Sequence, residues 1–181
     1  MSGSVVERMA RAVEAFGKDL GGFRTGRASA ALVEHITVDH YGAKTPLNQM
    51  AGISVPENTL LVVQPWDPTA IPAIEKALNN AQLGMTPAVD GNIIRLRVPS
   101  MTEERRKDLV KQMGKRTEEA RIEIRNARRD EQEAIKKLEK TKEIGEDDSR
   151  RQLEALQKAT DAKIAEIDRM ASSKEREVLE G

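Results

Sequence analysis

The residues of this chain with the clearest chemical capacity are arginines, four of which fall between positions 121 and 129. An arginine side chain can pair with a phosphate through two parallel hydrogen bonds. On a helix at about 100° per residue, these arginines share one side with three lysines, and only Glu118 is acidic there. We call this set the basic ridge: Lys107, Lys111, Arg121, Arg125, Arg128, Arg129 and Lys136. The ridge predicts contact with an RNA backbone, and the plain alternative is a solvated helix face with i,i+4 ion pairs.

Catalytic residues are not indicated anywhere in the sequence. Cysteine is absent, which excludes thiol nucleophiles and Cys-based metal sites. The two histidines, His35 and His40, are five residues apart on an expected strand, so they face opposite sides without metal-ligand spacing. The pair Gly21-Gly22 lies in a helical pattern and lacks the surrounding motif of a phosphate loop. We therefore expect no enzyme activity, no cofactor and no metal site.

The charges are divided unevenly along the 181 residues. Basic and acidic residues are equal, at 30 each, but residues 30–102 contain few of them and hold all seven prolines. This middle segment separates two charged, proline-free ends, which predicts an inserted domain. No apolar run is long enough to cross a membrane, and no signal peptide is visible. We expect a soluble cytoplasmic protein without a membrane partner.

Three amphipathic helices are predicted in the charged ends. The first opens with a capping box at Ser4 and Glu7 and ends near Gly26. The second opens with a capping box at Ser100 and Glu103 and runs about 42 residues, roughly 60 Å, to a C-cap at Gly145. The third begins with acidic residues 146–148. The expected apolar stripes are, in order, Val6, Met9, Val13, Phe16, Leu20 and Phe23; Leu109, Met113, Ala120, Ile124, Ala127, Ala134 and Leu138; and Leu153, Leu156, Ile164, Ile167, Met170, Ala171 and Val178.

Three stripes in one chain predict an elongated three-helix bundle in a monomer, and an intermolecular coiled coil is the alternative. The first helix spans only about 30 Å. We therefore expect it to flank the second helix up to about residue 123. Beyond that point, the second and third helices would form a two-helix tip. Arg125, Arg128 and Arg129 would lie at the base of this tip.

The proline-rich middle predicts a small mixed domain. Strands are expected at 36–40, 59–64 and 93–98, with a hairpin turn at Asp90-Gly91. A helix capped by Asp67 and ended by Gly84 would cover the sheet. The predicted fold is α+β, an elongated three-helix bundle of residues 1–29 and 103–181 with an inserted β/α/β domain of residues 30–102. The two crossings between them predict a hinge, at Gly26, Ala30, Pro99 and Met101.

Several motifs of the chain occur together in one known family. They are Arg24-Thr-Gly-Arg-Ala28, Tyr41-Gly42 with Thr45-Pro46-Leu47, Asp90-Gly91, Thr102-Glu-Glu-Arg-Arg-Lys-Asp-Leu109, Arg125-Asn-Ala-Arg-Arg-Asp130 and Lys142-Glu-Ile-Gly-Glu-Asp-Asp148. In this order, and over essentially the whole chain, the sequence resembles bacterial ribosome recycling factor. The resemblance implies a three-helix bundle with a hinged β/α/β domain.

The resemblance also implies a function. Such factors bind the post-termination ribosome and act with elongation factor G and GTP to split the subunits, so that messenger RNA and deacylated tRNA leave. The bundle would lie on large-subunit ribosomal RNA, with Arg128 at the position of a key contact. Arg125 and Arg129 belong to the same motif, Arg121 to the same ridge, and Arg24 and Arg27 to the junction motif. Two other interpretations remain open: a coiled-coil or chaperone-like module that holds proteins, and a helical arm of an RNA-modifying enzyme.

Overall fold

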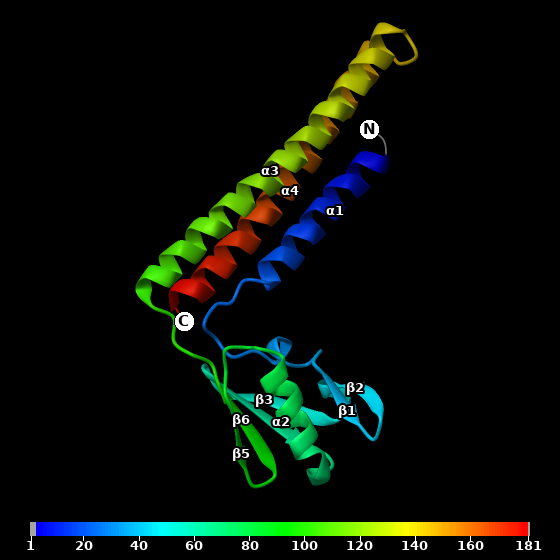
Figure 1. The fold of residues 1–181 in the computed structure, drawn as a ribbon. Helices are drawn as coiled ribbons and strands as arrows, with labels where there is room; N and C mark the ends of the chain where they lie inside the picture. The colour runs from blue at the N-terminus through cyan, green and yellow to red at the C-terminus, as the bar shows by residue number, and fades with distance from the viewer. Residues whose placement is uncertain (1–2, 181) are drawn as a thin grey trace. The chain divides into compact units, whose positions relative to one another are not determined.

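The computed structural model describes residues 3–180, which divide into two compact units (Figure 1). The helical unit comprises residues 3–24 and 103–180, and the mixed unit comprises residues 25–102. Residues 25–29 therefore group with the mixed unit rather than with the helices. Ala28 explains this grouping, because its backbone N–H donates to the carbonyl of Asn58 at 2.6 Å and its side chain packs against the core of the mixed unit.

The helical unit is a three-helix bundle, as predicted. Helices α1 (Gly3–Gly21), α3 (Glu103–Lys140) and α4 (Glu146–Glu180) lie side by side, and each contacts the other two (Figure 1). With 38 residues, α3 is about 57 Å long at 1.5 Å per residue. Among the described residues, no helix has the length and apolar character needed to cross a membrane.

The apolar side of α1 differs from the predicted one at its start. The helix begins at Gly3, so Ser4 lies in the first turn instead of at the cap. Val5 is buried, at 4% exposure, whereas Val6 is 39% exposed. From Met9 to Leu20 the predicted apolar residues are buried. The helix ends at Gly21, so Phe23 lies beyond it and the expected end near Gly26 is wrong.

The ends of the α3 stripe also differ from the prediction. Helix α3 begins at Glu103, so Ser100 is too far away to cap it. Near its other end Ile135 is buried, while Ala134 is exposed and Leu138 is 37% exposed. The cause is the helical period of 3.6, which drifts from a strict seven-residue repeat over a helix of this length.

The connection between α3 and α4 uses a lysine where a glycine was expected. Helix α3 ends at Lys140, and Lys142 adopts a left-handed conformation with φ of 61°. The N–H groups of Glu143 and Ile144 both donate to the carbonyl of Leu138, which closes the end of α3. Gly145 instead precedes α4, whose first turn carries the predicted acidic residues 146–148.

Helix α1 extends further along α3 than its length suggested. Arg8 pairs with Asp130 at 2.7 Å, and Asp19 pairs with Arg116 at 2.6 Å. The flanked part of α3 therefore reaches at least residue 130, and the expected limit near residue 123 is wrong. These pairs also show which side of α3 faces α1.

The mixed unit contains two antiparallel sheets. The smaller pairs β1 (Thr37–His40) with β2 (Ala43–Pro46), and the larger has the order β3-β4-β6-β5, from β3 (Ala51–Glu57), β4 (Leu60–Pro65), β6 (Ile93–Arg97) and β5 (Pro87–Asp90). Short 3-10 helices lie at η1 (Ala30–Leu32), η2 (Leu47–Gln49) and η3 (Pro68–Ala70). Strands β1, β4 and β6 match the predicted ones, whereas β2, β3 and β5 were missed. All three missed strands contain proline, which weakens a strand pattern.

Helix α2 (Ile71–Asn80) packs on this unit as predicted. Asp67 accepts hydrogen bonds from the hydroxyl and the backbone N–H of Thr69, at 2.7 and 3.0 Å, and these bonds lower the pKa of the Asp67 carboxyl. The predicted cap therefore belongs to η3, which leads into α2, and the residue at the start of α2, Ala70, makes no side-chain cap. Ile74 and Leu78 are buried in the core of the unit, together with residues of β4 and β6. The helix ends at Asn80, before the glycine expected to stop it.

Two glycines inside helices allow a test of the bundle packing. An alanine Cβ at Gly114 would meet nothing within 4 Å, so Gly114→Ala should raise the free energy of unfolding by about 1 kcal/mol. At Gly17 the same Cβ would lie 2.7 Å from Cε of Met170 on α4, and this flexible side-chain end would have to move aside, so Gly17→Ala should stabilise the protein less than Gly114→Ala does. Urea unfolding of the two variants measures the difference. Equal stabilisation by both would contradict this expectation and show that the Met170 methyl moves aside without cost.

Candidate RNA-binding face

The basic ridge lies on the flank of α3 that borders α4. Arg121 and Arg128 reach residues of α4, whereas Arg116 and Asp130 reach α1. Five of the seven ridge cations are exposed, and Arg121 and Arg128 are half-buried. The length of α1 is therefore irrelevant to the ridge, and the expectation that the ridge arginines lie where α1 has ended is wrong. The neighbour that limits their access is α4.

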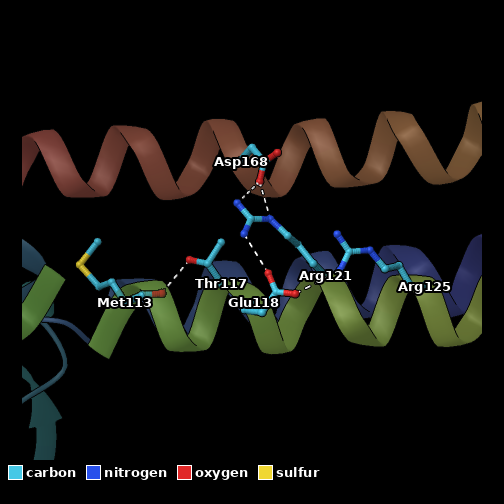
Figure 2. Close-up of polar contacts among 6 residues, drawn as sticks. All are labelled: Met113, Thr117, Glu118, Arg121, Arg125 and Asp168. Carbon is cyan, nitrogen blue, oxygen red and sulfur yellow. Dashed lines mark hydrogen bonds and ion pairs between the residues drawn. The ribbon is translucent and has the colours of Figure 1, made fainter. Parts of the chain in front are cut away.

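Arg121 lies at the centre of an ion-pair network (Figure 2). Its Nε and Nη2 donate to Oδ1 of Asp168 on α4, at 2.8 and 2.6 Å. Its Nη1 donates to Oε2 of Glu118 at 3.0 Å, and the other oxygen of Glu118 accepts from Nη1 of Arg125 at 3.1 Å. One acidic residue within the ridge thus holds two of its arginines.

These contacts shift the ionisation of the groups involved. The hydrogen bond from Arg121, followed by that from Arg125, lowers the pKa of the Glu118 carboxyl. The hydrogen bond to Asp168, followed by that to Glu118, raises the pKa of Arg121. All three nitrogens of the Arg121 guanidinium are engaged, so this side chain links α3 to α4. Nearby, the buried hydroxyl of Thr117 donates within its own helix, to the carbonyl of Met113 at 2.7 Å.

Arg128 and Arg129 have no acidic partner among residues 3–180. Nη1 of Arg128 donates to the amide oxygen of Gln157 on α4 at a long 3.4 Å, and its buried Nε has no hydrogen-bond partner. Arg129 is exposed, and no ion pair or hydrogen bond holds it within the described chain. Among the four arginines of the ridge, the positive charge is therefore least compensated at these two residues. Of these arginines, an anionic ligand would be attracted most strongly to this pair.

The remaining predicted site residues lie elsewhere. Arg24 is exposed in the helical unit, beyond the end of α1, and Arg27 is half-buried in the mixed unit. Both make interactions of their own. The predicted hinge positions Gly26, Ala30, Pro99 and Met101 all belong to the mixed unit.

The two histidines belong to the mixed unit, whereas the ridge belongs to the helical unit. The side chain of His35 is 82% exposed beside Glu34, and the ring of His40 packs at 4.4 Å against that of Tyr41. Within residues 3–180, no cluster of three His, Asp or Glu side chains could hold a metal ion.

Sequence reasoning missed the residues of α4 that face the ridge. Asp168 and Gln157 contact ridge arginines directly, and Asp161 accepts a hydrogen bond from Gln157. A signal was present, because positions 157, 161 and 168 are spaced by four and seven residues and so share one side of a helix. Because α4 runs antiparallel to α3, this spacing could have predicted that the three residues lie beside the ridge arginines.

The family model described as "Ribosome recycling factor" matches residues 16–179. Ribosome-recycling factors of Brevibacillus brevis and Bacillus pumilus are 52% and 51% identical over 174 residues, which cover 96% of this chain and 94% of each relative. The chain belongs to the ribosome recycling factor family.

Solved structures agree with this assignment. A solution structure of ribosome recycling factor aligns with a TM-score of 0.76 and 46% identity, over 98% of this chain and 94% of that one. A second structure is that of the T. thermophilus factor, which is described together with E. coli elongation factor G as bound to the E. coli post-termination complex. It aligns with a TM-score of 0.65 and 43% identity, over 97% of this chain and 95% of that one. The predicted fold class is confirmed.

The pH dependence of stability tests the Glu118 network. Because the pKa of Glu118 is lowered in the folded protein, its contribution is present above its ordinary value of 4.5 and is lost as the pH falls through the lowered value. We expect Glu118→Gln to be less stable than the parent at pH 7, with the difference shrinking below pH 4.5. Urea unfolding between pH 7 and 3 measures it.

Glu119→Gln is the matched control. Glu119 is the neighbouring exposed glutamate on α3, and it makes no hydrogen bond or ion pair with residues 3–180. Its stability difference from the parent should vary little over the same pH range. A pH-independent effect of Glu118→Gln would contradict the network.

Proposed function

We propose that this protein is a ribosome recycling factor. It binds the post-termination ribosome through large-subunit ribosomal RNA and acts with elongation factor G and GTP. Together they split the ribosome into subunits, which releases messenger RNA and deacylated tRNA. The observation that carries the proposal is family membership over nearly the whole chain, at about 50% identity. The relative bound with elongation factor G on a post-termination complex supports the choice of partners.

The ridge is the proposed contact with RNA. Phosphate contacts by Lys and Arg are independent of base sequence and depend strongly on salt. Arg128 and Arg129 are the primary candidates, because no acidic side chain of the described chain pairs with either. Arg125 remains a candidate through its exposed side chain, although it shares Glu118. Arg121 contributes mainly by linking α3 to α4, and Arg24 and Arg27 are additional candidates.

The protein would not be an enzyme in this proposal. The ridge offers charge and hydrogen-bond donors, and hydrolysis of GTP belongs to elongation factor G. The protein contributes a shaped, charged body that binds the ribosome. A chaperone-like module would instead bind unrelated proteins, so salt-sensitive cosedimentation with ribosomes separates the two functions.

A subunit-splitting assay tests the function directly. Post-termination ribosomes would be mixed with this protein, elongation factor G and GTP, and light scattering would report dissociation. We expect splitting only when both proteins and GTP are present. Absence of splitting with active elongation factor G would refute the proposal.

Arg128→Ala tests the site. The substitution removes a charge-assisted donor set worth about 1.5–3 kcal/mol, or roughly ten- to a hundredfold in ribosome affinity. The helix should persist, because alanine is the best helix former. We expect a folded protein that binds ribosomes weakly, with a log–log salt slope reduced by about 0.7–0.9. Cosedimentation with ribosomes at several salt concentrations measures both quantities.

Lys158→Ala is the control for charge removal on α4, where Lys158 is exposed. It should change affinity much less than Arg128→Ala. Arg128→Ala binding like the parent at physiological salt would mean that the ridge is only a solvated face.

We also propose that the two crossings between the units act as a hinge. The crossings touch, because a Cβ built on Gly26 would lie 3.3 Å from Cγ of Met101, and Gly26 has a φ of 77° that favours glycine. Backbone N–H groups of Ala28 and Val98 donate to Asn58 and Thr59, at 2.6 and 2.7 Å. These bonds tie both crossings to the mixed unit. The pivot is therefore proposed on the helix-side part of each crossing, near Gly26 and Met101.

An engineered disulfide can test this hinge. The built Cβ of Gly26 lies 3.8 Å from Cβ of Met101, a usual separation for a disulfide, and the chain has no other cysteine. The oxidised double variant Gly26→Cys/Met101→Cys should bind ribosomes normally but split them more slowly. The same protein after reduction is the matched control, because it carries the same strain at position 26. Equal splitting rates for the two forms would argue against a working hinge.

A further inference from the structure

Arg128 is held by a neutral side chain of α4. Its Nη1 donates to Oε1 of Gln157 at 3.4 Å, and Nε2 of Gln157 donates to Oδ1 of Asp161 at 2.8 Å. Gln157 and Asp161 are four residues apart on one side of α4, and both are exposed. The three residues form a chain of hydrogen bonds that begins on the ridge and ends on α4.

The orientation of the Gln157 amide follows from its two neighbours. Arg128 offers only donors, and the Asp161 carboxylate only acceptors. The amide can satisfy both only with its oxygen toward Arg128 and its nitrogen toward Asp161. Asp161 therefore fixes which end of the amide faces the ridge.

On the same flank of α4, the partner of Arg121 is a different type of side chain from that of Arg128. Arg121 donates two hydrogen bonds, neither longer than 2.8 Å, to the carboxylate of Asp168. Arg128 instead donates one hydrogen bond of 3.4 Å to the amide oxygen of Gln157. A carboxylate cancels the charge of an arginine, and an amide oxygen orients it without cancelling the charge. The long bond to Gln157 is also easily exchanged for a shorter one to a phosphate oxygen.

We propose that Gln157 is a positioning residue for ribosomal RNA binding. It orients the Arg128 guanidinium toward a phosphate and leaves its positive charge uncompensated, and Asp161 sets the amide for this task. The inference rests on the proposed function, because it assigns a role to a neighbour of the proposed contact residue.

The variant Gln157→Glu separates charge from shape. A glutamate has nearly the same shape, and repulsion from Asp161 directs its carboxylate toward Arg128. The new ion pair would compete with phosphate, so affinity for vacant ribosomes should fall about two- to fivefold, the factor that an exposed ion pair represents. Gln157→Ala removes the orienting contact but adds no charge, so its loss should be smaller.

A double-mutant cycle with Arg128→Ala measures whether the effect of Gln157→Glu on ribosome affinity depends on Arg128. A purely structural role of Gln157 would not produce this dependence. In the Arg128→Ala background, Gln157→Glu should cause no further loss, because the arginine that it would neutralise is gone. Gln112→Glu is the matched charge control, since Gln112 is an exposed glutamine on the opposite side of α3 from the ridge. It should leave affinity within about twofold of the parent. Circular dichroism and thermal melting confirm folding of each variant.

The possible outcomes separate the role of Gln157 from the proposed RNA contact of Arg128. If Arg128→Ala binds like the parent, the proposed RNA contact fails and the inference fails with it. If Arg128→Ala binds weakly but Gln157→Glu binds like the parent, the contact stands and the role of Gln157 is refuted. If Gln157→Glu weakens binding equally in both backgrounds, its carboxylate repels RNA directly and the positioning role is refuted.

Discussion

The helical unit depends on the long contact between α3 and α4. Both helices are too polar to be stable alone, and helices of this kind gain most of their stability by packing. Their shared seam buries Ile124, Leu156 and Ile167 almost completely. Helix α1 completes the bundle by placing Phe16 in the same core, where Arg116 lies 5.6 Å from the centre of its ring. A ridge held by this seam has a defined shape before any ligand arrives.

The same contact between α3 and α4 gives two arginines of the ridge different roles. Arg121 and Arg128 are seven residues apart, so they occupy the same side of α3. Helix α4 presents Asp168 to the first and Gln157 to the second. One arginine therefore contributes to the join between helices, while the other keeps its charge for a partner. The division between structural and binding residues is a property of the pair of helices.

The mixed unit is stabilised by a hydrophobic core of its own. Residues of α2, β4 and β6 such as Ile74, Leu61 and Leu96 are fully buried together. Its hydrogen bonds to Ala28 and Val98 hold the first and last parts of the inserted chain at one turn, Asn58–Thr59. Insertion into the helical unit thus requires only two short crossings.

The sequence alone determined the bundle, the inserted domain and the ridge, because a helical period and a run of arginines are local patterns. The turn between α3 and α4 was harder to predict, since Lys142 adopts the left-handed conformation expected of a glycine, in a turn that Glu143 and Ile144 close by donating to the carbonyl of Leu138. Strands β2, β3 and β5 were missed for a similar reason, because pairing with neighbouring strands defines them. Only the tertiary structure decided which ridge arginines are compensated. That outcome depends on residues of α4 some 30 to 50 positions away, which become neighbours of the ridge when the two helices pack.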